Sequence, residues 1–129
     1  MKLKSLRVTA ILVLLIAMQS SFAAPAGEQT ALATIANIMI NLNHFPSASE
    51  KAQLRTIAND EAVSAHERAI ATAMANLQHS ATATDKRKLS KIMEDESAPA
   101  AVKEMASIIF HLNHKPSGED KQKLKQMLK

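Results

Sequence analysis

Three histidines occupy equivalent positions in this sequence, 35 residues apart, and each follows an amide residue. Imidazole nitrogen is a common ligand of zinc, copper and nickel, so a metal site is the sharpest chemistry that this spacing suggests. Packed helices lie roughly 8–10 Å apart, however, and we therefore expect equivalent positions of successive repeats to be too widely separated for one ion to bind all of them. The three residues are His44, His79 and His114.

We instead predict a structural role for these three histidines. We place each in the last turn of a helix, where an imidazole can bond free carbonyl groups or interact with the helix dipole. Across the turn that follows, each can also reach a carboxylate, at Glu50, Asp85 or Asp120. A feature present in every copy is expected to maintain the repeat, so we expect no bound metal and no cofactor.

A second histidine arrangement is the pair His111 and His114, which are three residues apart and so share one helix face. Glu119 or Asp120 would supply a third ligand. Neither an HExxH motif nor a cysteine accompanies the pair. The pair is therefore only a weak alternative for a metal site.

The sequence favours a protein that is not an enzyme. It has no cysteine nucleophile, and its two glycines form no phosphate-binding loop. Serine and threonine hydroxyls stand where they would cap helices, and no pair of carboxylates lies alone in an apolar run, where a raised pKa would be expected. We predict no catalytic residues.

A row of uncharged polar residues runs along the first helix of each repeat, beside its apolar stripe. Asparagine amides both donate and accept hydrogen bonds, so such a row can pair with a peptide backbone. The competing interpretation is hydrogen bonding between repeats inside the array. The residues that we predict to bind a partner are Asn37, Asn41, Asn76 and His111, with Ile40 and Phe110 as apolar anchors.

The chain from residue 30 aligns with itself at a shift of 35 residues, which is typical of stacked helical repeats. We predict an all-α domain of three helix hairpins, with repeats at 30–64, 65–99 and 100–129. Apolar residues at steps of three and four, followed by a Ser or Thr cap with an acidic residue three positions later, divide each repeat into two helices. The expected helices are 30–44, 48–59, 65–79, 83–94, 100–114 and 118–128.

The two helices of each repeat differ in charge, and this difference predicts their placement. The first-helix regions contain two long stretches without a charged residue, 29–49 and 69–84. Asp85, which directly follows the second stretch, belongs to the cap of the next helix. We expect the first helices to form an inner layer and the charged second helices an outer one, as an α-solenoid-like or compact array. Glu119 and Lys123 are spaced for an ion pair. The repeat length is similar to that of tetratricopeptide repeats, but their Trp, Gly and Tyr positions are missing.

The N-terminus has the three parts of a secretory signal peptide. A basic segment, an apolar run at 8–18 and small residues at Ser21 and Ala23 predict cleavage after Ala23, leaving 24–29 as a short linker. We therefore expect a periplasmic or secreted protein with no stable membrane insertion. Three of the 16 basic residues lie in this segment, which leaves 13 against 12 acidic ones. This balance gives no reason to expect nucleic-acid binding.

Together these features predict a non-enzymatic binding module for a protein or peptide. The alternative function is binding or buffering of a transition metal through histidine. The uncharged first helix has no preceding repeat to cover it, so it is also a candidate surface for a homodimer.

Overall fold

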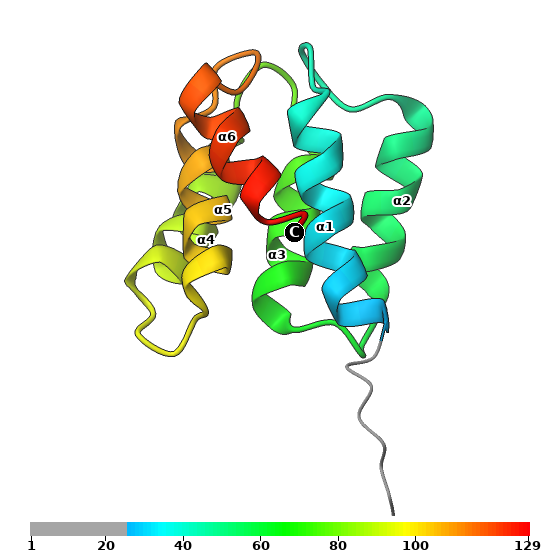
Figure 1. Cartoon of the computed structure of the whole chain (residues 1–129), viewed down its shortest axis with the longest axis vertical. Coiled ribbons are helices and arrows are strands. Elements are labelled where there is room, and N and C mark those ends of the chain that lie inside the picture. The colour runs from blue at the N-terminus through cyan, green and yellow to red at the C-terminus, as the bar shows by residue number, and fades with distance from the viewer. Residues whose placement is uncertain (1–25) are drawn as a thin grey trace, which may run out of the picture.

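The computed structural model describes residues 26–129, and this part of the chain consists of six α-helices with no strand (Figure 1). The prediction of an all-α fold with paired helices is therefore confirmed. The predicted signal peptide lies outside the described residues. The helices are α1 (Ala26–Ile40), α2 (Ala48–Asn59), α3 (Ala65–Ala75), α4 (Ala83–Glu94), α5 (Ala100–His111) and α6 (Gly118–Gln126).

The inner helices α1, α3 and α5 end three or four residues before the predicted positions. At each end a leucine N–H donates to the carbonyl three residues back, at 3.2–3.3 Å, which tightens the last turn and stops the α-helix. These leucines are all buried, so the chain turns inward at this point instead of continuing the helix. They are Leu42, Leu77 and Leu112.

We predicted that the three repeated histidines lie in the last turn of a helix, and this prediction is wrong because each helix ends before its histidine. They lie in the connections between the two helices of each repeat, which we call the tip loops (residues 41–47, 76–82 and 112–117). The far side of each loop is anchored by a buried residue, which is Pro46, Ala81 or Pro116. In the first and third loops the proline also disfavours a helical conformation of the residue before it, which helps to keep the loop out of the helix. The tip loops are thus held at both ends by buried side chains.

The outer helices begin at the predicted caps. The hydroxyls of Ser47, Thr82 and Ser117 each accept a hydrogen bond from the backbone N–H three residues later. In the first and third copies the acidic side chain also accepts from the cap N–H, which completes a capping box. These bonds orient the start of each outer helix against its tip loop.

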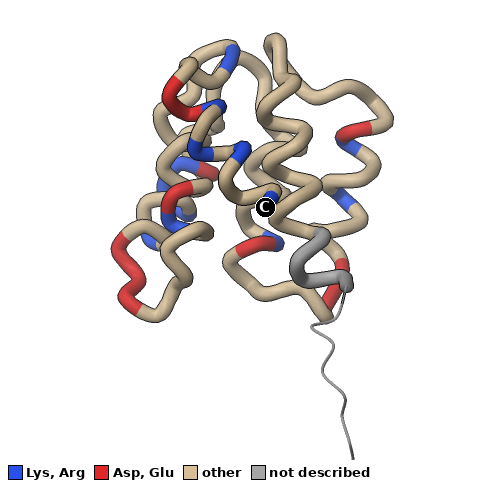
Figure 2. Tube along the Cα trace, in the orientation of Figure 1, with Lys and Arg blue, Asp and Glu red and all other residues tan. Residues whose placement is uncertain are grey.

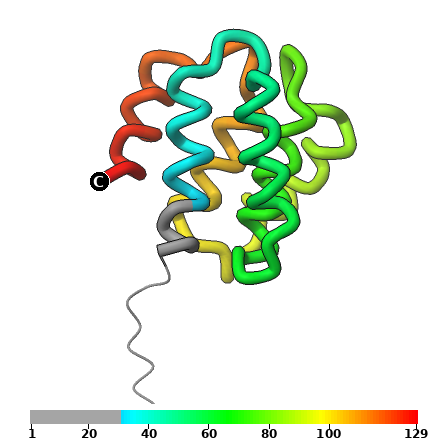
Figure 3. The backbone as a smooth tube through the Cα atoms, turned by 90° about the vertical axis from the view of Figure 1, so that its right-hand side faces the viewer, coloured from blue at the N-terminus to red at the C-terminus, as the bar shows by residue number. Residues whose placement is uncertain are grey.

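The hairpins are arranged in a closed ring rather than an open stack. α2 packs on α3, α4 packs on α5, and α6 returns to pack on α1, so each outer helix covers the inner helix of the next repeat (Figures 1 and 3). The α1–α6 contact thus brings repeat three back onto repeat one. It also removes our reason to expect a homodimer through α1, because α6 takes the place of the preceding repeat.

The core lies between the three inner helices, as the apolar pattern predicted. Ile35, Ile70 and Met105 are equivalent positions, and each is fully buried. Each outer helix contributes one fully buried leucine to this core. These leucines are Leu54, Leu89 and Leu124.

Most charged residues lie on the outer helices and on the turns (Figure 2), and this agrees with the predicted solvated layer. The expected ion pair between Lys123 and Glu119 is present at 3.2 Å. None of the helices within residues 26–129 has both the length and the apolar character needed to cross a bilayer.

Candidate functional site

The closed ring brings the three repeated histidines together at one end of the molecule. The ring centroids of His44 and His79 are 5.8 Å apart, those of His44 and His114 are 5.3 Å apart, and those of His79 and His114 are 4.8 Å apart. All three side chains are exposed. Our expectation that equivalent positions are too far apart was therefore wrong, because the histidines lie on loops that converge and not on the helices whose spacing we used.

Hydrogen bonds tie the second and third tip loops at this cluster. The His114 N–H donates to the His79 carbonyl at 2.7 Å, and the Nδ1 atoms of the two imidazoles are 3.1 Å apart. His114 has a φ of 66°, a left-handed conformation that is uncommon for a residue with a side chain. This backbone turn places the His114 ring against both of the other imidazoles.

The spacing of the three rings resembles that of imidazoles around a metal ion. An ion about 2.1 Å from one nitrogen of each ring, at tetrahedral angles, places the ring centroids roughly 5 Å apart. The observed separations of 4.8–5.8 Å lie close to this value. Among the residues that the structure describes, however, no three His, Asp or Glu side chains are oriented to hold an ion as they stand. The rings of the exposed cluster would have to turn to aim three nitrogens at one point.

The carboxylates nearest in sequence to the cluster are already used by helix caps. Glu50 accepts from the Ser47 N–H at 2.7 Å. Asp120 accepts from the Ser117 hydroxyl at 2.8 Å and from its N–H at 3.2 Å. Buried Asp85 accepts from Thr82 and Asn76. Among the described residues, the cluster histidines make no hydrogen bond to these carboxylates, contrary to our expectation.

A small open pocket of 220 Å³ borders the histidine cluster on the side of repeat one. Lys51 and Phe45 line it from repeat one, and the Lys51 Nζ lies 5.4 Å from the centre of the Phe45 ring. His79 belongs both to the cluster and to the pocket wall. The remaining lining residues are Leu77 and Gln78.

The alternative metal site at His111 and His114 lacks the third ligand that we considered, because Glu119 and Asp120 make other contacts. The His111 Nδ1 lies 2.9 Å from the Ser107 carbonyl, and its ring packs edge-on against Phe110. Glu119 binds Lys123, and Asp120 caps α6. His114 instead faces the other two repeated histidines.

The predicted partner-binding row lies on the surface, with exposed polar members and half-buried apolar ones. Asn41 Nδ2 donates to the Asn37 carbonyl, and Asn76 Nδ2 donates to the Asp85 carboxylate. In the described part of the chain, these hydrogen bonds stay within a repeat and do not link repeats. The exposed members are Asn37, Asn41, Asn76 and His111, and the half-buried ones are Ile40 and Phe110.

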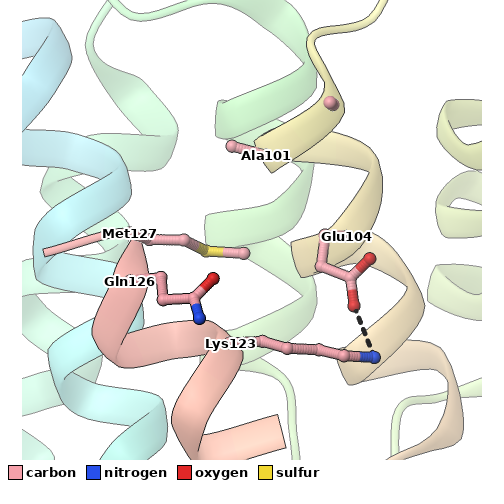
Figure 4. Close-up of a pocket in the computed structure, with 6 residues that line it drawn as sticks. Ala101, Glu104, Lys123, Gln126 and Met127 are labelled. Atoms are coloured by element: carbon pink, nitrogen blue, oxygen red, sulfur yellow. Dashed lines mark ion pairs between the residues drawn. The ribbon is translucent and has the colours of Figure 1, made fainter. Parts of the chain in front are cut away.

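One ion pair between the two helices of repeat three was not predicted from the sequence. Lys123 Nζ lies 3.0 Å from Glu104 Oε1, which joins α6 to α5 at an open groove of 440 Å³ (Figure 4). The bond to Glu104, followed by that to Glu119, raises the pKa of Lys123 above its ordinary value. Both helices belong to repeat three, and the pairing of Lys123 with Glu104 depends on how these two helices lie relative to each other, which no local spacing reports.

The fold and the histidine cluster define a closed all-α repeat protein with an imidazole-rich tip. The sequence matches no family model, and comparisons with curated proteins and with solved structures likewise find no match. The function of this chain must therefore be inferred from the geometry of its own residues.

Proposed function

We propose that this chain is a non-enzymatic protein that binds a transition-metal ion through His44, His79 and His114. The observation that carries the proposal is the separation of 4.8–5.8 Å between the three ring centroids. Ligands that are distant in sequence but adjacent in the fold form a site only when the chain is folded, as protein metal sites usually require.

The chemistry of the three side chains indicates the class of metal. Neutral imidazoles suit zinc, copper(II) and nickel, whereas magnesium and calcium require oxygen ligands. Exposed side chains rotate on the picosecond to nanosecond timescale, so the cluster can aim its nitrogens inward without a change of fold. The 3.1 Å separation of the His79 and His114 Nδ1 atoms is already close to the distance between two nitrogens bound to one ion.

The test is a calorimetric titration of the metal-free protein with zinc and with nickel. We expect one ion per chain, and each of the variants His44→Ala, His79→Ala and His114→Ala should weaken binding by at least about tenfold, or 1.4 kcal/mol. The chain supplies matched controls in its other two histidines. His66→Ala and His111→Ala should bind as the unchanged protein does, and equal loss in all five variants, or no binding at all, would contradict the proposal.

A second candidate function, binding of a protein or peptide, is favoured by the exposure of the uncharged row. Within the described residues, the amides of Asn41 and Asn76 use their Nδ2 atoms as donors and no bond is accepted by their oxygens, which lie in the same row as half-buried Ile40. Partners captured with the purified protein should be lost from an Asn41→Ala/Asn76→Ala variant. If Lys121→Ala/Lys125→Ala loses them instead, the basic terminal helix is the binding surface.

We further propose that the protein acts in the periplasm or outside the cell after cleavage of residues 1–23. The basic segment, the apolar run and the small residues before Ala24 support this proposal. The intact mass of the exported protein tests it. A mass that includes Met1–Ala23 would contradict the proposal.

A further inference from the structure

We infer that two copies of this chain exchange α6 and so form a dimer, in which α6 of each copy packs on α1 of the other. The partner is thus a second copy of the same chain. The surface that binds it is the α1–α6 contact, which closes the ring within a single chain. In both forms α6 covers α1, and only the chain that supplies α6 differs.

The position of α6 makes this exchange possible. α6 is the last helix of the chain and, with 9 residues, the shortest of the described helices. Its main contact is with α1 and not with α5, the other helix of its own hairpin. An open groove of 440 Å³ lies between α5 and α6, and the ion pair of Lys123 with Glu104 spans it (Figure 4). α6 can therefore leave its place without breaking the packing of α2 on α3 or of α4 on α5.

The apolar surface of α6 favours a second copy as the partner. Leu124 is fully buried, and Pro116 just before the helix is buried as well. A chain that releases α6 exposes these side chains and the α1 surface beneath them to water, which is unfavourable. A second released chain offers both matching surfaces, so the same contacts form between copies. Exchange of an identical element is a low-cost route to a dimer for this reason.

The hinge of the exchange is tip loop three, residues 112–117, and its backbone is strained. The Lys115 N–H donates to the Asn113 carbonyl at 2.8 Å, and His114 between them has a φ of 66°. A γ-turn with a positive φ at its central residue is rare and strained. Among the described residues other than glycine, only His114 has a positive φ, so tip loops one and two lack this turn.

Opening of the hinge releases this strain in both copies of the dimer. It also breaks the hydrogen bond from the His114 N–H to the His79 carbonyl. Both residues are exposed, so water can replace that bond at little net cost. The closed chain and the exchanged dimer thus share their apolar contacts and differ mainly in the hinge, which favours the dimer at high protein concentration.

The test is size-exclusion chromatography with light scattering after refolding at millimolar protein concentration in EDTA, which excludes dimers bridged by a metal ion. We expect the unchanged protein to form a dimer beside the monomer. His114→Gly should lower the association constant at least about fivefold, because glycine adopts a positive φ without strain and so stabilises the closed monomer. His44→Gly, at the equivalent position of tip loop one, should leave the association constant unchanged.

Deletion of His114 and Lys115 should shift the balance in the opposite direction. The shortened hinge cannot return α6 to α1 of the same chain, so we expect only dimer, with the helix content of the unchanged protein. Deletion of His44 and Phe45 is the matched control. It shortens tip loop one, but α2 lies between two other hairpin elements of the chain, so this deletion should lower stability without favouring the dimer.

Subunit exchange identifies the kind of dimer. Dimers of chains labelled with heavy nitrogen are mixed with unlabelled dimers and followed by native mass spectrometry. Mixed dimers should appear only after warming or in mild urea, because α6 must first leave its place. Immediate mixing would indicate a surface contact and overturn the inference. A monomeric unchanged protein, a deletion variant that folds as a monomer, or equal association of His114→Gly and the unchanged protein would also overturn it.

Discussion

His79 Nδ1 lies 3.1 Å from His114 Nδ1, although 35 residues separate the two histidines in the chain. A nitrogen that accepts a hydrogen bond must be unprotonated, so at most one of these two Nδ1 atoms carries the proton. The same pair of atoms can therefore share a proton or, once both are free of it, bind one metal ion. The two atoms meet because the tip loops of repeats two and three lie side by side, where the His114 N–H donates to the His79 carbonyl at 2.7 Å.

Zinc should raise the melting temperature of the folded protein. The ion would bind three repeats of the folded chain at once, and a ligand that binds only the folded state stabilises it by about 2.7 kcal/mol at 100 times its dissociation constant. Thermal melts with zinc and with excess chelator measure the shift. The His44→Ala variant should show a much smaller shift, and identical melts of the unchanged protein in both conditions would argue against the site.

Leu77→Ala should destabilise the protein by about 2–5 kcal/mol, because truncation of a buried leucine leaves a cavity. Leu77 is fully buried at the base of the second tip loop. The neighbouring exposed residue supplies the control, since Gln78→Ala should change the free energy of unfolding by less than about 0.5 kcal/mol. Urea denaturation followed by circular dichroism measures both, and equal stabilities would show that Leu77 does not anchor the loop.

The repeat pattern predicted the helices, the caps and the inner layer because these depend on local spacing. The 35-residue period placed Leu54, Leu89 and Leu124 in equivalent buried positions, as the structure confirms. The period does not report the rotation from one repeat to the next, which decides whether an array closes. That rotation brings His44 close to His114. The sequence therefore showed that the histidines recur at equivalent positions, but it did not show that they come into contact.

Buried acidic residues show a second limit of the sequence. Glu67 and Asp85 both occupy capping positions and are both less than 6% exposed, whereas Glu50 and Asp120, the equivalents of Asp85 in the other repeats, are half-buried. Asp85 compensates with hydrogen bonds from Asn76 and Thr82. The capping motif predicts the hydrogen bond of the acidic side chain, but it does not predict how far neighbouring helices bury that side chain.

Asp95→Asn should reduce stability at neutral pH but have little effect in strong acid. The Ser97 hydroxyl and N–H, followed by His66 at 2.9 Å, hold the pKa of Asp95 below its ordinary value of 3.8. A carboxyl whose pKa is lowered by folding stabilises the protein above its unfolded-state pKa, and this contribution is lost as the pH falls through the folded-state pKa. The stabilities of the two proteins should therefore begin to converge as the pH falls below about 4 and become similar below the folded-state pKa of Asp95.

Thermal melts at pH 7 and pH 3 measure this convergence. Asp60→Asn is a suitable control, because Asp60 is the equivalent residue of repeat one and accepts from the Ala62 N–H without a histidine partner in the described part of the chain. A difference between Asp95→Asn and the unchanged protein that is as large at pH 3 as at pH 7 would contradict the assignment.

The closed ring also predicts tolerance of circular permutation. α6 packs on α1 in the same sense as α2 packs on α3, so a linker that joins residue 129 to residue 26 restores a hairpin-to-hairpin connection. New termini between Glu96 and Ser97, both exposed in the turn that follows α4, should break no core contact. We expect this permutant to unfold cooperatively and to melt near the temperature of the unchanged protein.

New termini between Ala73 and Met74 provide the contrasting variant, since both residues are buried within α3. That permutant should lose helicity and cooperative melting, because the break interrupts an inner helix and its hydrogen bonds. In an open array, the permutant at Glu96–Ser97 would separate α4 from α5 without a native α1–α6 contact to replace it. Loss of folding in both permutants would therefore show that the α1–α6 contact does not close the ring in solution.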